Sequence, residues 1–168
     1  AGENAITSNA QNYYIIRTAW LYGWAGKNFV YTMIRAMNSR DSVKVVNDQF
    51  GSPTFAGDLA AVIVKIIKNA GRIPYGTYHF TDKGEISWWD FANEIKTLGT
   101  KAGWISNKNC AVNPCSTEEY PTPAKRPAYS VLSKVKIQDA LGEEIPGWTE
   151  SLEKFLSSPF FDKTRIEA

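Results

Sequence analysis

An apolar run, a polar loop and a periodic helix follow one another between residues 42 and 70, and this order constrains the fold more than any other feature. Val43, Val45 and Val46 favour a strand. The loop Asn47–Thr54 then contains a glycine, a proline and an aromatic residue. A strand and a helix hold such a loop rigidly, as ligand sites of α/β proteins require, although most connections of this kind bind nothing. Apolar residues next recur at helical spacing, at Leu59, Val62, Ile63, Ile66 and Ile67.

The rest of the chain repeats this alternation of β-type runs and amphipathic helices. Composition predicts strands at residues 13–18, 42–46, 75–81 and 111–115, of which the first reads as a buried strand. Periodicity predicts helices at residues 1–9, 28–38, 55–70, 86–98, 134–141 and 149–156. This alternation indicates an α/β fold. The second half has more loop and helix than strand, which suggests a lobe over the end of a sheet.

Local signals predict where several helices begin and end. Ser87 followed by Asp90 three residues later is typical of an N-cap, and Gly99 is expected to end that helix. Ser133 is the predicted cap of a shorter helix that Gly142 should stop.

Composition and charge exclude several classes of function. A net charge of +2 over 168 residues is too small to indicate a nucleic acid or a membrane surface as partner. The longest apolar run, Leu59–Ile67, is interrupted by Lys65 and is too short to cross a bilayer. The chain shows no signal peptide. It does not begin with Met and its first residues read as the middle of a helix, so we expect a piece of a longer protein.

The thiols and the single histidine argue against a metal site built by this chain. Cys110 and Cys115 lie close together, but their spacing is not that of a Cys-x-x-Cys pair, and one histidine leaves too few ligands for zinc. We expect both thiols to be reduced, with a small loop disulfide as the alternative. His79 lies inside an apolar strand and is expected to be a core or edge residue rather than a catalytic one.

Complete catalytic sets are missing from the sequence, whereas candidate binding residues are present. Gly23 and Gly26 are the nearest approach to a dinucleotide-binding fingerprint, and no Tyr-x-x-x-Lys pair occurs. Trp20 follows a strand at the end where α/β sheets place ligands, where its ring could stack on a sugar or fill the core. Lys125 and Arg126 lie on a proline-flanked segment that could hold an arginine towards a phosphate, or could be a solvated basic pair.

Two segments are specific: Asp-Gln-Phe-Gly-Ser-Pro-Thr at 48–54 and Pro-Thr-Pro-Ala-Lys-Arg-Pro at 121–127. Further segments extend the match over nearly the whole chain, namely Ile-Arg-Thr-Ala-Trp-Leu-Tyr-Gly at 16–23, Asn-Phe-Val at 28–30, Gly-Asp-Leu-Ala at 57–60, Gly-Thr-Tyr-His-Phe-Thr at 76–81 and Ser-Trp at 87–88. In this order they resemble the dTDP-4-dehydrorhamnose reductase family, a branch of the extended short-chain dehydrogenase/reductases.

This resemblance implies a fold and a reaction. The fold would be the C-terminal part of a Rossmann-type, NAD(P)-binding α/β fold with an appended, mainly helical substrate-binding lobe, and residues 1–168 would form that substrate-binding portion. The whole enzyme would reduce the C4 ketone of dTDP-4-dehydro-L-rhamnose with NADPH or NADH. Its catalytic tyrosine and lysine and its glycine-rich loop would precede Ala1, so this chain alone should be inactive. The resemblance also implies a cytoplasmic protein, with a homodimer and Mg²⁺ as features of some members.

The resemblance assigns roles to particular residues. Thr18 and Ala19 would approach the nicotinamide end of the cofactor, and Trp20 would line the deoxysugar pocket. Arg126 would face the diphosphate of the dTDP-sugar. Residues of the loop would border the nucleotide-sugar, namely Gln49, Phe50, Gly51, Pro53 and Thr54.

Two alternatives remain open at this point. One is a non-catalytic relative that keeps the fold and binds a partner, such as the regulatory subunit of methionine adenosyltransferase. The other is a different nucleotide-sugar reductase or epimerase on the same scaffold. Trp20 and the intact loop from Gln49 to Thr54 favour the enzyme over the regulatory relative.

Overall fold

The computed structural model describes residues 1–167 of the chain as a mixed α/β fold. Its helices are α1 (Gly2–Asn9), α2 (Phe29–Ser39), α3 (Ala56–Lys68), α4 (Trp88–Lys101), α5 (Val135–Leu141), α6 (Trp148–Leu156) and α7 (Thr164–Glu167). Its strands are β1 (Tyr14–Arg17), β2 (Leu21–Tyr22), β3 (Ser42–Val46), β4 (Phe50–Gly51), β5 (Thr54–Phe55), β6 (Gly76–His79), β7 (Ile86–Ser87) and β8 (Ala111–Cys115).

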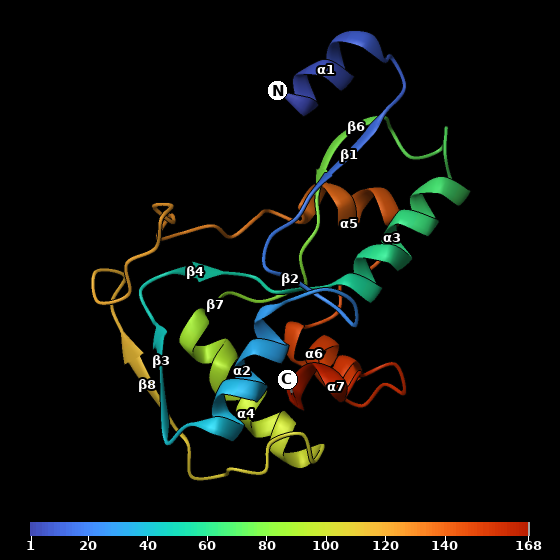
Figure 1. The fold of residues 1–168 in the computed structure, drawn as a ribbon. Helices are drawn as coiled ribbons and strands as arrows, with labels where there is room; N and C mark the ends of the chain where they lie inside the picture. Colours follow the sequence, from blue (N-terminus) through green and yellow to red (C-terminus); the bar gives the residue numbers. More distant parts are fainter. Residues whose placement is uncertain (168) are drawn as a thin grey trace.

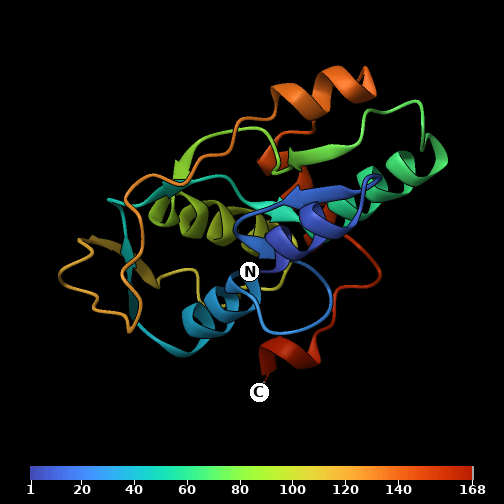
Figure 2. The same cartoon turned by 90° about the horizontal axis from the view of Figure 1, so that it is seen from above.

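The strands pair two by two rather than in one broad sheet. Three pairs are parallel, β1 with β6, β2 with β5 and β3 with β8, and β4 runs antiparallel to β7. Helices lie between the members of the parallel pairs along the chain, which confirms the predicted α/β class. Figures 1 and 2 show β1, β6, α3 and α5 in one part of the molecule and α2, α4 and α6 in another.

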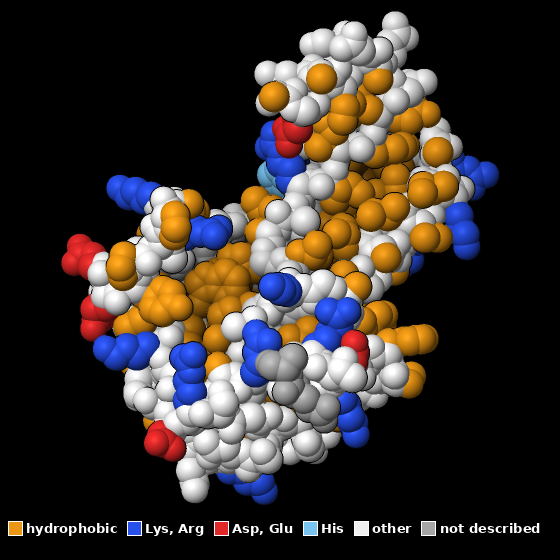
Figure 3. All heavy atoms as spheres, in the orientation of Figure 1, with side chains coloured by type: hydrophobic (Ala, Val, Ile, Leu, Met, Phe, Trp, Pro, Cys, Tyr) orange, Lys and Arg blue, Asp and Glu red, His pale blue; other side chains and the backbone are white. Residues whose placement is uncertain are grey.

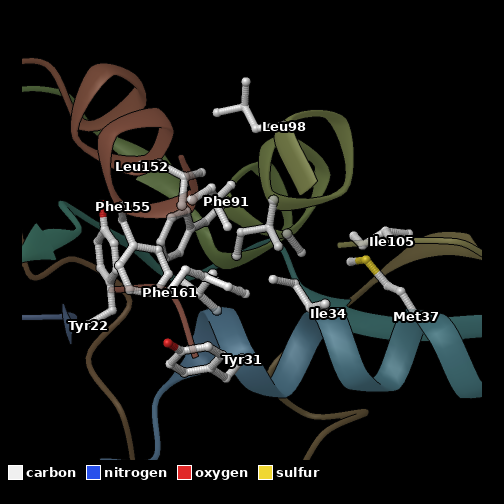
Figure 4. Close-up of a cluster of buried hydrophobic side chains, with 14 of the residues drawn as sticks. Tyr22, Tyr31, Ile34, Met37, Phe91, Leu98, Ile105, Leu152, Phe155 and Phe161 are labelled. Atoms are coloured by element: carbon white, nitrogen blue, oxygen red, sulfur yellow. The ribbon is translucent and has the colours of Figure 1, made fainter. Parts of the chain in front are cut away.

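The larger hydrophobic core joins α2, α4 and α6. Ile34 and Met37 of α2 are fully buried, as their spacing on one helix face requires. Phe91 of α4 and Phe155 of α6 complete the centre of this core, whose side chains Figure 4 shows gathered between the three helices. A capping box starts α4: Ser87 Oγ accepts from Asp90 N, and an Asp90 carboxylate oxygen accepts from Ser87 N, as predicted.

A smaller core joins α3, β6 and α5 through Val62, Ile66, Tyr78, Phe80 and Ile137. The periodic stripe of α3 is only partly used in it. On the same helix Ile63 and Ile67 stay 39% and 67% exposed, and hydrophobic side chains cover this part of the surface in Figure 3. This surface is apolar although it faces solvent in the part of the chain that the structure describes.

Three predictions about element ends and burial are wrong. Gly99 does not end its helix, because α4 continues to Lys101. Gly99 packs against the side chain of Ile105, and a Cβ on it would lie 3.0 Å from Ile105 Cδ1. Ser133 does not cap α5, whose N-cap is Lys134 without a side-chain capping bond. The strand at 13–18 is half-buried rather than buried, since β1 pairs with β6 alone among the described strands.

Other sequence expectations are confirmed. Gly142 ends α5 with a left-handed φ of 66°, which glycine adopts without strain. His79 is half-buried on β6, paired in register with Arg17. Cys110 and Cys115 are both buried and unpaired, so the loop disulfide does not form.

Candidate functional site

A cavity of about 540 Å³ opens between α2, β3, the start of α4 and the segment that follows β8. Figure 3 shows hydrophobic side chains around a hollow over β4 and β7. Two of the lining residues are cationic and none is acidic. The lining residues are Ala19, Trp20, Phe29, Met33, Lys44, Val45, Val46, Gln49, Trp88, Tyr120, Thr122, Arg126, Pro127 and Ser130.

Trp20 and Trp88 form a stacked pair at the edge of this cavity. Their ring centroids lie 3.6 Å apart with an interplanar angle of 13°. Phe29 packs against Trp88 at 4.6 Å, so the pair rests on the core. Trp20 adopts a φ of 49°, a left-handed conformation that is uncommon for a large side chain and persists only when its surroundings fix it.

Thr54 holds the turn at Trp20 through hydrogen bonds to three consecutive residues, Thr18, Ala19 and Trp20. Its Oγ1 donates to the carbonyl oxygen of Ala19 at 2.7 Å and accepts from Thr18 Oγ1 at 3.1 Å. Its backbone N donates to the carbonyl oxygen of Trp20 at 3.2 Å. Thr54 is fully buried. It therefore holds the segment that carries Trp20, from behind the cavity wall.

Gly51 allows Trp20 to lie flat beside β4. A Cβ at Gly51 would be 2.5 Å from Trp20 Cε2, closer than real side-chain contacts come. Ser52 and Pro53 next to it are also buried. The glycine and proline of the loop thus shape the wall on which the indole rests.

Gln49 and Asp48 fasten the end of β3 to the residues after β8. Gln49 Nε2 donates to Thr117 Oγ1 at 3.0 Å, and Thr117 donates to Asp48 from its Oγ1 at 2.6 Å and from its N at 2.9 Å. These bonds to Thr117 hold the pKa of the Asp48 carboxyl below its usual value. The amide of Gln49 reaches the cavity from this fixed position.

Phe50 contributes its backbone rather than its ring. Its N donates to the carbonyl oxygen of Ala128 at 2.8 Å, and its carbonyl oxygen accepts from Ser130 N at 2.8 Å. This pairing anchors the proline-rich segment beside β4 and presents Arg126 to the cavity. Arg126 is exposed, so its guanidinium can meet a ligand without first breaking a buried contact.

Asp82 supports the same wall from below and is fully buried. Its Oδ2 accepts from Phe55 N at 2.8 Å, and its own N donates to the carbonyl oxygen of Pro53 at 3.0 Å. Its Oδ1 and the hydroxyl of Tyr22 are buried without a hydrogen-bond partner. Burial raises the pKa of the Asp82 carboxyl to about 7.

This raised pKa predicts a specific pH dependence of stability. The folded state holds the Asp82 proton more tightly than the unfolded chain, so its contribution is present at low pH and is lost as pH rises towards 7. Asp82→Asn keeps an acceptor for Phe55 N and carries no charge. As pH rises from 5 to 7, we expect the free energy of unfolding of the wild type to fall by roughly 2 kcal/mol relative to that of the Asn variant. Urea titrations at a series of pH values measure this, and parallel pH profiles for the two proteins would contradict it.

The predicted site residues fall into two groups around the cavity. Ala19, Trp20, Gln49 and Arg126 line the cavity. The remaining predicted residues shape or support its wall, namely Thr18, Phe50, Gly51, Pro53 and Thr54.

Sequence reasoning missed two prominent lining residues, Trp88 and Lys44. Trp88 directly follows the N-cap Ser87, and this local signal predicts where the helix begins but not where the indole ring lies. Lys44 alternates with Val43 and Val45, which are buried, and strand alternation could have placed it on the other face.

The chain is an α/β protein whose main cavity is lined by aromatic rings and by two cations, Lys44 and Arg126. A family model described as the RmlD substrate binding domain matches residues 1–159, and the chain belongs to this family. It is 40% identical over 154 residues to the dTDP-4-dehydrorhamnose reductase of Aggregatibacter actinomycetemcomitans. These residues cover 90% of this chain and 52% of that relative.

Solved structures agree with this assignment. The dTDP-4-dehydrorhamnose reductase of Clostridium acetobutylicum superposes with a TM-score of 0.82 at 46% identity, over 92% of this chain and 51% of that one. The enzyme of Bacillus anthracis in complex with NADP gives 0.81 at 40% identity, again over 92% and 51%. The chain therefore spans about half the length of the relatives it matches.

Within residues 1–167, two kinds of feature are absent. No group of three or more His, Cys, Asp or Glu residues in this range could hold a metal ion. No helix among these residues is long and apolar enough to cross a membrane.

Proposed function

We propose that this chain is the substrate-binding part of a reductase that converts dTDP-4-dehydro-L-rhamnose into dTDP-L-rhamnose. The observation that carries the proposal is the convergence of Arg126 with the Trp20–Trp88 pair on one cavity that no carboxylate lines. Aromatic rings suit the flat base and the apolar face of a deoxysugar. An arginine suits a diphosphate, because its donors match phosphate oxygens.

We also infer that residues 1–168 belong to a Rossmann-type fold whose cofactor-binding part lies outside this chain. The exposed apolar residues of α3 support this division, since a further α/β layer would bury them. A cytoplasmic location and a homodimer are expectations of the same proposal.

We infer that the cofactor meets this chain near Thr18 and Ala19. Ala19 lines the cavity next to Trp20 with a small apolar side chain, which is compatible with an aromatic ring such as the nicotinamide. The hydroxyl of Thr18 is held by Thr54, which fixes its position. NADPH, or NADH in its place, would supply the hydride. The sequence offers no glycine-rich loop for its phosphates. A role for Mg²⁺ remains an expectation without assigned ligands.

Arg126→Ala tests the proposal in a protein that carries this chain together with the cofactor-binding part. We expect KM for dTDP-4-dehydro-L-rhamnose to rise about tenfold while kcat changes little, because the lost contact serves the ground state and the transition state alike. Initial rates of NADPH oxidation measure both constants.

Lys125→Ala is the matched control, since Lys125 is the neighbouring exposed cation and does not line the cavity. Unchanged kinetics in the Arg126 variant would remove this residue from the site. The chain of 168 residues alone should oxidise no NADPH, and turnover by it would refute the division into two parts.

A further inference from the structure

Lys44 lies on strand β3 and is one of the residues that line the cavity. Val43 and Val45 point into the core, with 6% and 5% exposure, while Lys44 between them is exposed on the other face. β3 is paired with β8 along its whole length, and Lys44 stands opposite Asn113 in register. The lysine therefore rises from a fixed strand, unlike Arg126, which lies on an irregular segment.

Lys44 and Arg126 bring two cationic side chains to the cavity. In the part of the chain that the structure describes, neither Lys44 nor Arg126 has an ion-pair partner. The carboxylates of Asp48 and Glu119 are hydrogen-bonded to Thr117 and to the N of Ser116, and neither forms an ion pair with Lys44. Two unpaired cations in one cavity without an acid favour a ligand with more than one negative charge.

The two cations are also of complementary kinds. An arginine binds phosphate through a planar fork of donors, whereas a lysine acts as a compact point charge on a flexible stem. They come from different walls, β3 and the segment after β8. A diphosphate offers two adjacent charged groups, so each cation can take one of them.

We propose that Lys44 is a second anion-binding residue of this cavity and that it holds the diphosphate of the nucleotide ligand together with Arg126. This inference rests on the proposed function and assigns to Lys44 the discrimination between a nucleoside diphosphate and an uncharged nucleoside. The apolar and aromatic residues of the cavity then serve the base and the sugar.

Calorimetric titration of a protein that carries this chain together with the cofactor-binding part tests this with three probes: thymidine, thymidine diphosphate and inorganic pyrophosphate. We expect Lys44→Gln to weaken thymidine diphosphate binding about tenfold, in the range of a charge-assisted hydrogen bond, and thymidine binding less than twofold. Lys44→Arg should restore most of the loss, because it returns the charge. Equal loss with pyrophosphate would show that Lys44 acts on the phosphates alone.

Lys108→Gln is the matched control, an exposed lysine outside the cavity. The outcomes separate this inference from the proposed function. If the wild-type protein binds thymidine diphosphate, Arg126→Ala weakens it and Lys44→Gln does not, the role of Lys44 is refuted and the proposed function stands. If the wild-type protein with both parts binds none of the three probes, both are refuted.

Discussion

Phe155→Ala is expected to lower the free energy of unfolding by about 4 kcal/mol, the range measured when a buried aromatic ring is removed from a core. Phe155 is fully buried on α6, and its ring meets the rings of Tyr22 and Tyr31 at 5.3 Å and 5.6 Å. Figure 4 shows it beside Tyr22 in the larger core. Because small domains are stable by only about 5–15 kcal/mol, this loss should bring the chain close to unfolding at 37 °C.

Phe160→Ala provides the control, because the same side chain is removed a few residues further along from a position that is 69% exposed. We expect it to cost less than about 1 kcal/mol. Denaturant titrations followed by circular dichroism compare the two variants. Equal losses would mean that the core does not centre on Phe155.

Gly51→Ala should have the largest effect on the site itself. The added Cβ would lie 2.5 Å from Trp20 Cε2, and the stack on Trp88 limits how far the indole can retreat. Overpacking of this kind costs about 1–3 kcal/mol. We expect the stacked pair to be disturbed and thymidine diphosphate to bind about tenfold more weakly. Near-UV circular dichroism of the indoles and calorimetry report the two effects.

Gly2→Ala separates this steric effect from a general intolerance of alanine, because a Cβ at Gly2 meets nothing within 4 Å. It should leave both readouts unchanged. An unchanged indole spectrum in the Gly51 variant would show that Trp20 is free to move, and would remove the basis for a fixed aromatic wall.

Much of the fold could be predicted from local signals in the sequence. The capping pair of Ser87 and Asp90 and the left-handed stop at Gly142 follow from rules that need only neighbouring residues. The stop predicted at Gly99 was wrong because the glycine serves a tertiary contact. Gly99 lies inside α4 and leaves room for the side chain of Ile105. Burial of the strand at 13–18 was overestimated because composition does not tell how many neighbours a strand has.

The site shows the same division between local and tertiary information. Motifs indicated the right loop, but not which of its residues face a ligand and which support the wall. Thr54 was predicted to border the ligand, and the structure shows it bonded to the turn that carries Trp20. Trp88 lies far from Trp20 in the sequence, so only the folded chain reveals that they stack.

The pairing of the strands also has a consequence for how fast this chain can fold. Each of the four pairs described above joins segments with at least one helix between them along the chain, as β3 and β8 show. Each pair must therefore close a long loop before its hydrogen bonds contribute, and that entropic cost comes first. Chains whose contacts are this distant in sequence fold slowly and leave strand edges open to other chains in the meantime. Refolding yield should consequently fall with protein concentration well before native stability becomes limiting.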